Sequence, residues 1–154
     1  GDTQRPCSCT PAQIQRYRAR LSGPLLDRVD LQLEVPALPV EDLRPGGERP
    51  AAEPSATVRD RVAATRAHQM ARMGAPAAEL GAKGVEAHCR PDDTALAFLE
   101  SAAGRLGLSA RSYHRILKLG RTLADLAGHD TIDRSHIAEA IQYRRLDLQA
   151  DPAS

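Results

Sequence analysis

The sequence predicts a mainly helical protein, in which a four-helix bundle follows one further helix and one strand. Beyond residue 56, segments with apolar residues at helical spacing lie between capping residues and glycines. Residues 29–35 alternate strictly between apolar and polar side chains, as a half-buried strand does. Residues 36–54 contain five prolines and separate these two parts of the chain.

The first predicted helix begins at Thr10, which fits the N-cap position. Pro11 then takes the first helical position, and Gln13 completes a capping box. The strand at 29–35 comes after a short turn and has no second convincing strand to pair with. Because one strand cannot satisfy its own backbone hydrogen bonds, we expect residues 1–56 to be poorly ordered in this chain.

The bundle consists of a helix at 57–73 and three helices that begin at Asp92 or Asp93, at Ser109 and at Asp133. Ile132 and Ile137 are placed as a hydrophobic staple around the last of these caps. Residues 75–91 are ambiguous, with one short helical piece near 77–80. The residues expected to face inward on the four helices are Val58, Val62, Met70, Met73, Leu96, Leu99, Ala103, Leu106, Tyr113, Ile116, Leu117, Leu123, Ala124, Ile137, Ala140 and Ile141.

Composition limits the class of protein. A chain of 154 residues can hold one core, or one domain with an irregular arm. A net charge of +1 argues against a uniformly basic nucleic-acid surface. No apolar run approaches the ~20 residues that cross a bilayer, and no signal peptide opens the chain. Three cysteines do not suggest a secreted disulfide framework, so we expect a cytoplasmic origin. Because Gly1 stands where an initiator methionine would, we expect a piece of a longer protein.

Two arginines are candidates for contacts with anions. Arg28 lies at a corner between the predicted helix and strand, and Arg111 lies in the first turn of a predicted helix. A cation is disfavoured at a helix N-terminus unless an anion joins it, and no acid occurs within residues 109–122. The alternatives are a surface ion pair of Arg28 with Asp27 or Asp30, and for Arg111 a snorkelling side chain or a pair with an acid on another helix.

Other candidate groups carry weaker signals. Arg115 and Lys118 follow Arg111 on the same helix face and could contact phosphate or nucleic acid, although a solvated face explains them as well. Cys7 and Cys9 form one pair of thiols, which is half of a tetrahedral zinc site, and we expect this half site to be empty in this chain. His114 and His136 lie in amphipathic helices and are interpreted as structural. The sequence contains no catalytic triad, paired catalytic carboxylates or phosphate-binding glycine loop.

Three stretches of the chain resemble the C-terminal part of the magnesium-chelatase-like AAA+ ATPases, specifically the bacterial competence-protein ComM (YifB) group. They are Cys7-Ser-Cys-Thr-Pro-Ala-Gln-Ile14 with Ser22-Gly-Pro-Leu-Leu-Asp-Arg-Val-Asp30, the segment from Leu108 to Gly128, and His136-Ile-Ala-Glu-Ala-Ile-Gln-Tyr-Arg144 preceded by Ile132.

The resemblance implies a division into four parts. Residues 1–35 would be the C-terminal remnant of the α/β ATPase core, and residues 36–56 a linker. Residues 57–148 would be the helical lid, and residues 149–154 a tail. The chain departs from the family pattern at Gly120, where alanine is usual.

The same resemblance implies roles for single residues. Arg28 matches the arginine finger, which reaches the nucleotide of the adjacent subunit, and Arg111 matches the sensor-2 arginine that contacts the nucleotide from the lid. Cys7 and Cys9 match one of two cysteine pairs of a zinc site. Full-length members are implied to use ATP and Mg²⁺, to form hexameric rings and to translocate on DNA during branch migration in natural transformation.

We expect this chain alone to be monomeric, to bind no cofactor and to hydrolyse no ATP, since it lacks the Walker A and Walker B motifs. Two other classes remain open. One is the ATPase subunit of magnesium chelatase in tetrapyrrole synthesis, which shares both arginines. The other is a stand-alone helical module that binds DNA or a protein partner through its basic helix, and salt-dependent binding of DNA by this chain would favour it.

Overall fold

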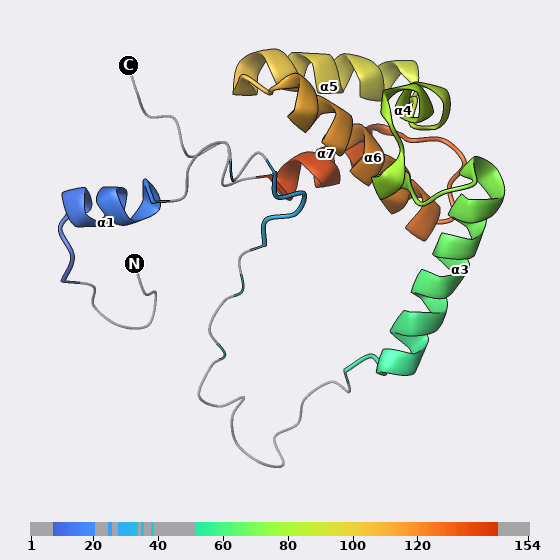
Figure 1. Ribbon diagram of the computed structural model, residues 1–154, viewed down its shortest axis with the longest axis horizontal. Coiled ribbons are helices and arrows are strands. Elements are labelled where there is room, and N and C mark those ends of the chain that lie inside the picture. The colour runs from blue at the N-terminus through green and yellow to red at the C-terminus, as the bar shows by residue number, and fades with distance from the viewer. Residues whose placement is uncertain are drawn as a thin grey trace.

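The protein folds into a group of packed helices, which confirms the mainly helical class predicted from the sequence. The computed structural model describes residues 8–20, 25, 28–33, 35, 38 and 52–144. Their elements, shown in Figure 1, are α1 (Pro11–Arg18), α3 (Ser55–Met73), the 3₁₀ turn η2 (Ala77–Glu79), α4 (Ala82–His88), α5 (Asp93–Leu106), α6 (Ala110–Leu126) and α7 (Arg134–Gln142).

The strand expected at residues 29–35 is not formed in the described part of this segment. Residues 29–33 and 35 form neither helix nor strand, and no second strand lies beside them in the part of the chain that the structure describes. The backbone N–H of Gln32 instead donates to the carbonyl oxygen of Tyr143 at 2.7 Å. The expectation of poor order over residues 1–56 falls largely on residues outside the described ranges.

Side-chain caps and glycines set the helix ends much as the sequence predicts. The Thr10 side chain accepts from the backbone of Gln13 in a complete capping box. Ser109 caps α6 and Asp133 caps α7, while Asp92 rather than Asp93 caps α5. The glycines that end α3 and α5 adopt left-handed backbone conformations, with φ of 71° at Gly74 and 60° at Gly107.

Helix α6 lies at the centre of the fold, where it packs against α7, α3, α4 and η2, while α5 packs against α7. An isolated parallel bridge between Pro91 and Ile132 joins the loop before α5 to the loop before α7. The buried residues of the core come from α4 to α7 and their loops; they are Val85, Cys89, Ala95, Leu99, Ile116, Leu117, Ala124, Ile132, Ile137 and Ala140.

The inner face of α5 differs by one position from the predicted stripe. Leu99 is buried as expected, but its buried companions are Ala95 and Ala102, and Leu106 is 37% exposed. Small side chains let α5 approach its neighbours closely, so the alanines rather than the flanking leucines occupy the interface. Periodicity located the helix but not the exact centre of its buried face.

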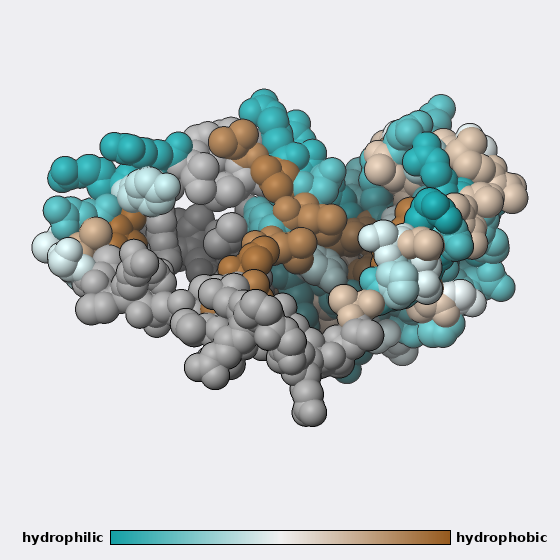
Figure 2. Space-filling model, turned by 90° about the horizontal axis from the view of Figure 1, so that it is seen from below, coloured by the Kyte–Doolittle hydropathy of each residue, from teal (hydrophilic) through white to brown (hydrophobic). Residues whose placement is uncertain are grey.

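Helix α3 is attached to the bundle through its C-terminal end, as Figure 1 shows. On the predicted apolar side, Val62 is 52% and Met70 44% exposed, while Val58 and Met73 are half-buried. The buried residue of this helix is Gln69. Exposed hydrophobic side chains also occur in the irregular segment of residues 29–33 and 35, at Leu31, Leu33 and Val35. Figure 2 shows such side chains gathered in the middle of one face of the molecule.

The sequence does not define the structure of residues 75–91, and the structure contains two short helical elements there. The expected piece near residues 77–80 is η2, and α4 is an additional helix of seven residues. Helix α4 contains Gly84 and follows Gly81, whose position at the N-cap provides no side-chain hydrogen bond. A short helix without a capping side chain leaves a weak pattern in the sequence. Within the described ranges, no helix has the length and apolar character needed to span a bilayer.

Candidate functional site

The N-terminus of α6 positions the first candidate residue. The Ser109 hydroxyl oxygen accepts from the backbone N–H of Ser112 at 3.1 Å, which fixes the first turn. Arg111 lies within this turn, on the exposed surface. The structure therefore places Arg111 in the first turn of α6, whose backbone N–H groups carry partial positive charge and favour the binding of an anion.

A cavity of about 340 Å³ opens beside this turn. Basic side chains of α6 form one wall, and apolar residues from the region of η2 and α4 form the other. No carboxylate is among the lining residues, which are Leu80, Gly81, Ala82, Val85, Ala110, Arg111, His114, Arg115 and Lys118. The cavity combines an apolar wall with a cationic wall. Such a combination suits a ligand that has a flat apolar group and an anionic substituent.

Two of the cations in this wall have partners within the chain. The Arg115 Nε lies 2.9 Å from a carboxylate oxygen of Asp30. The Lys118 Nζ donates to the carbonyl oxygen of Ala78 at 3.1 Å. Both side chains are half-buried, whereas Arg111 is exposed. The structure thus brings Arg111, Arg115 and Lys118 to one cavity.

Arg28 lies in a turn rather than before a regular strand. Its backbone N–H donates to the carbonyl oxygen of Leu25 at 2.9 Å, and Arg28 is exposed. The carbonyl oxygen of the following residue, Val29, accepts from the Arg144 guanidinium at 3.2 Å. The corner that presents Arg28 is therefore attached to the end of α7, 115 positions further along the chain.

Arg144 was not among the candidate residues predicted from the sequence. It is 1% exposed and contacts both Val29 and Ser112, the residues that directly follow Arg28 and Arg111. A single arginine just after a helix is ordinarily a surface residue, so local pattern could not identify this one. The available indication was that Arg144 ends the His136–Arg144 stretch, one of the three stretches that resemble the family.

The cysteine pair is described only in part. Cys7 lies outside the described residues, and Cys9 is exposed just before the N-cap of α1. A tetrahedral zinc site needs four ligands, and one pair of thiolates supplies two. Cys7 and Cys9 alone therefore do not fit a complete tetrahedral zinc site.

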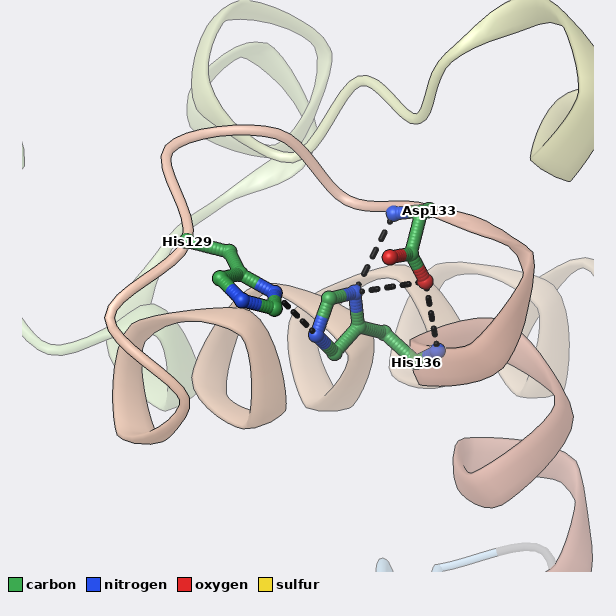
Figure 3. Close-up of side chains that lie close together, drawn as sticks. All are labelled: His129, Asp133 and His136. Carbon is green, nitrogen blue, oxygen red and sulfur yellow. Dashed lines mark hydrogen bonds and ion pairs between the residues drawn. The ribbon is translucent and has the colours of Figure 1, made fainter.

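Three potential metal ligands, His129, Asp133 and His136, gather between α6 and α7 (Figure 3). The Nδ1 atom of His136 accepts from the Asp133 backbone N–H at 3.1 Å and lies 3.0 Å from the Asp133 carboxylate. The opposite ring nitrogen, Nε2, lies 3.3 Å from Nδ1 of His129. The imidazole of His136 stands between the other two groups, so this cluster is a capping box extended by a second histidine. The structural interpretation of His136 is supported.

Comparison with known proteins identifies the protein family to which the chain belongs. Residues 52–144 match the family model described as magnesium chelatase, subunit ChlI C-terminal, and residues 1–43 match magnesium chelatase, subunit ChlI. The chain therefore belongs to the magnesium chelatase ChlI family, and its bundle is consistent with the C-terminal helical lid of a magnesium-chelatase-like AAA+ protein.

The relatives narrow this class to the ComM and YifB group. The chain is 50% identical to competence protein ComM of Haemophilus influenzae over 137 residues, which are 89% of this chain and 26% of that protein. It is 42% identical to the uncharacterized protein YifB of Escherichia coli over 143 residues, with 90% and 27% covered. The uncharacterized protein Mb2921c of Mycobacterium bovis is 34% identical over 155 residues, with 91% and 30% covered. The chain thus spans between a quarter and a third of the length of these relatives.

Proposed function

We propose that this chain is the lid and arginine-finger region of a ComM-like AAA+ ATPase. In the complete protein, ATP hydrolysis would be coupled to translocation on DNA and branch migration during natural transformation. The proposal includes a cytoplasmic, hexameric ring, with residues 1–35 as the end of the ATPase core and residues 57–148 as the lid. Membership of the ChlI family and 50% identity to ComM support it.

The observation that carries the nucleotide assignment is the position of Arg111. The side chain lies in the first turn of α6, at a cavity whose lining contains three further basic or imidazole groups and no carboxylate. A guanidinium keeps its charge at any physiological pH and offers a rigid fork of donors to phosphate oxygens. Arg111 would therefore contact the phosphates of ATP, and the apolar wall formed with Leu80 and Val85 would face the remainder of the nucleotide.

Arg28 would act on a different nucleotide. Its exposure at a corner of the chain suits a side chain that reaches outward, and in a closed ring each subunit presents the same surface to the next. An arginine supplied in this way neutralises charge that develops on the transferred phosphoryl group. The catalytic groups outside this chain and Mg²⁺, which neutralises phosphate charge, would supply the remainder of the chemistry. Arg115 and Lys118 would contact nucleic acid only on release of the Asp30 carboxylate and the Ala78 carbonyl oxygen.

The test is ATP hydrolysis by the complete ring-forming protein that contains this chain. Arg28→Ala should lower kcat by about 10³–10⁵-fold, the range for arginine fingers, and Arg111→Ala should lower kcat/KM strongly while both variants remain folded. Arg105→Ala is the matched control, because Arg105 is an exposed arginine in the last turn of α5 and outside the cavity. Full activity of both the Arg28 and the Arg111 variant would refute the assignment.

A second candidate function comes from the description of the family itself, magnesium chelatase. An ATPase subunit of that enzyme would use the same two arginines to support insertion of magnesium into a tetrapyrrole. The two functions differ in what the complete protein does with the energy of hydrolysis. ATP-dependent unwinding of branched DNA without stimulation of magnesium insertion would support the ComM-like function, and the reverse result would support the chelatase function.

A further inference from the structure

Among the described residues, Arg144 is the most deeply buried arginine. It is 1% exposed, and its guanidinium donates to two distant groups. One nitrogen donates to the carbonyl oxygen of Val29 at 3.2 Å, and the other donates to the hydroxyl of Ser112 at 3.1 Å. Burying a guanidinium is costly unless good hydrogen bonds replace those lost from water, so these two contacts carry considerable weight.

Each of the two partners is covalently next to a candidate arginine. Val29 follows Arg28, and Ser112 follows Arg111. Ser112 is also part of the cap of α6, since its N–H donates to the Ser109 hydroxyl at 3.1 Å and its own hydroxyl accepts from Ser109 at 3.2 Å. The fork of Arg144 therefore spans the backbone beside Arg28 and the turn that orients Arg111.

Two additional contacts hold residues 30 and 32 against the bundle. The Gln32 N–H donates to the Tyr143 carbonyl oxygen at 2.7 Å, and the Asp30 carboxylate lies 2.9 Å from the Arg115 Nε. Gln32 is only 9% exposed although it belongs to an otherwise exposed segment. Residues 29–32 are thus attached to the N-terminal half of α6 and to the end of α7 at three points.

We infer that Arg144 is a positioning residue that joins the arginine finger to the lid, so that Arg28 and Arg111 of one subunit are held as a single unit. This inference rests on the proposed function. If Arg111 contacts the nucleotide of its own subunit and Arg28 that of the neighbour, the Arg144 guanidinium sets where the finger stands relative to the lid. A shift of about 1 Å in a catalytic group is enough to cost about 10²-fold in rate.

The chemistry of the site requires an arginine. The two acceptors belong to different segments, and a planar fork can donate to both at once from fixed positions. A lysine at this position places one compact charge and keeps part of the attachment, whereas a methionine fills a similar volume and provides no donor. The series Arg144→Lys and Arg144→Met therefore separates hydrogen bonding from packing.

Arg121 offers a control with matched burial. It is 3% exposed, and its guanidinium donates to the carbonyl oxygens of His129 and Asp130, both at 2.6 Å. These contacts lie at the end of α6 that is away from Arg111. Arg121→Met therefore removes a buried arginine, its carbonyl contacts and its ion pair with Asp125, none of which involves the described residues of the segment that carries Arg28.

The kinetic experiment uses the complete ring-forming protein, at a temperature where every variant is folded by circular dichroism. Arg144→Met should lower kcat for ATP hydrolysis by about 10–100-fold with less than a twofold change in KM, and Arg144→Lys should recover part of the loss. Because Arg144 acts through Arg28, adding Arg144→Met to Arg28→Ala should lower kcat no further than Arg28→Ala does alone. Arg121→Met should leave kcat unchanged.

The outcomes separate the inference from the proposed function. Full activity of the Arg28→Ala and Arg111→Ala variants would overturn the proposed function and this inference with it. If the Arg28→Ala and Arg111→Ala variants lose activity but Arg144→Met has a normal kcat, this inference alone is overturned. Equal losses of kcat in Arg144→Met and Arg121→Met would overturn it as well. Multiplicative losses in the Arg28→Ala, Arg144→Met double variant would do the same.

Amide exchange on the 154-residue chain tests the attachment without any assay of activity. The N–H of Gln32 should exchange slowly because it donates to Tyr143, and it should lose this protection in Arg144→Met. The Arg121→Met variant should retain it. Equal protection of Gln32 in the wild-type chain and in Arg144→Met would show that Arg144 does not hold this segment, and would overturn the inference.

Discussion

Cys89 shows how strongly the core acts on a single ionisable residue. It is fully buried at the C-terminal end of α4, among the apolar residues of the bundle. Burial raises the pKa of its thiol from 9.0 to about 11, because a thiolate would lose its hydration, and the nearby cations of Arg121 and Lys118 offset only part of this effect. The thiol therefore stays protonated and unreactive at neutral pH.

This pKa shift predicts an alkaline dependence of stability. In the unfolded chain the thiol ionises near pH 9, whereas in the folded chain it holds its proton to about pH 11. The folded state then binds more protons between these values, so stability is present below pH 9 and is lost as the pH rises toward 11. From pH 8 to 11, the free energy of unfolding should fall by about 2 kcal/mol more for the wild-type chain than for Cys89→Ala. Urea unfolding at several pH values measures this difference, and parallel curves would contradict it.

The arginines of α6 illustrate what a sequence can and cannot say about one residue. The Ser109 cap correctly placed Arg111 in the first turn of its helix. Local pattern could not reveal that Arg115 pairs with Asp30, or that Arg121 is buried against Asp125. The distance along the chain between Arg115 and Asp30 hides their contact from any local pattern. Arg144 is hidden in the same way, since both of its partners are supplied by tertiary structure.

At the scale of secondary-structure elements, the ends of helices were more predictable than their buried faces. Capping residues act through backbone groups a few positions away, so Thr10, Ser109 and Asp133 could be recognised locally. Whether a face is buried depends on what packs against it. That is why α3 exposes part of its predicted apolar side, and why the segment at 29–35 remains without a ladder in its described residues.

Two glycines inside helices make a matched pair for testing this difference between local and tertiary effects. A Cβ added at Gly104, on the exposed side of α5, would meet no atom within 4 Å. One added at Gly120, in buried α6, would lie 3.0 Å from Cδ1 of Ile137 and 3.3 Å from Cγ2 of Ile132. Alanine improves helix propensity equally at both positions, but only at Gly120 must neighbouring core side chains move to make room for it.

Gly104→Ala should therefore raise the free energy of unfolding by about 0.5–1 kcal/mol. Gly120→Ala should gain less than this, because the Ile137 side chain must move away from the new methyl group. Urea unfolding of both variants measures the difference. An equal gain at the two positions would show that Ile137 adapts without cost.

At the scale of the whole molecule, a buried polar network joins α3 to the rest of the bundle. The Asp125 side chain is fully buried on α6, accepts from Gln69 at 2.9 Å and forms an ion pair with Arg121 at 2.7 Å. Arg72 of α3 makes a further ion pair with the same carboxylate, and a second one with Asp130 at 2.8 Å. The Gln69 side chain also accepts from the backbone of Ala77, which ties the network to η2.

Such a network determines the orientation of α3 more sharply than apolar contact would, since every partner has a fixed direction. It also concentrates the attachment at one carboxylate. Removing that carboxylate leaves the 3% exposed guanidinium of Arg121 without its buried counter-ion, and removes a partner from both Gln69 and Arg72. Breaking one partner of a buried ion pair is costly because the other charge stays buried.

Asp125→Ala should therefore lower the free energy of unfolding of the 154-residue chain by about 3–5 kcal/mol. Asp130→Ala is the matched control, because its side chain is 93% exposed and pairs with the same Arg72, so its loss should cost less than about 1 kcal/mol. Urea unfolding compares the two variants, and amide exchange along α3 shows whether this helix detaches first. Equal costs for the two aspartates would mean that apolar packing, rather than this carboxylate, holds α3 in place, since the exposed pair alone contributes little.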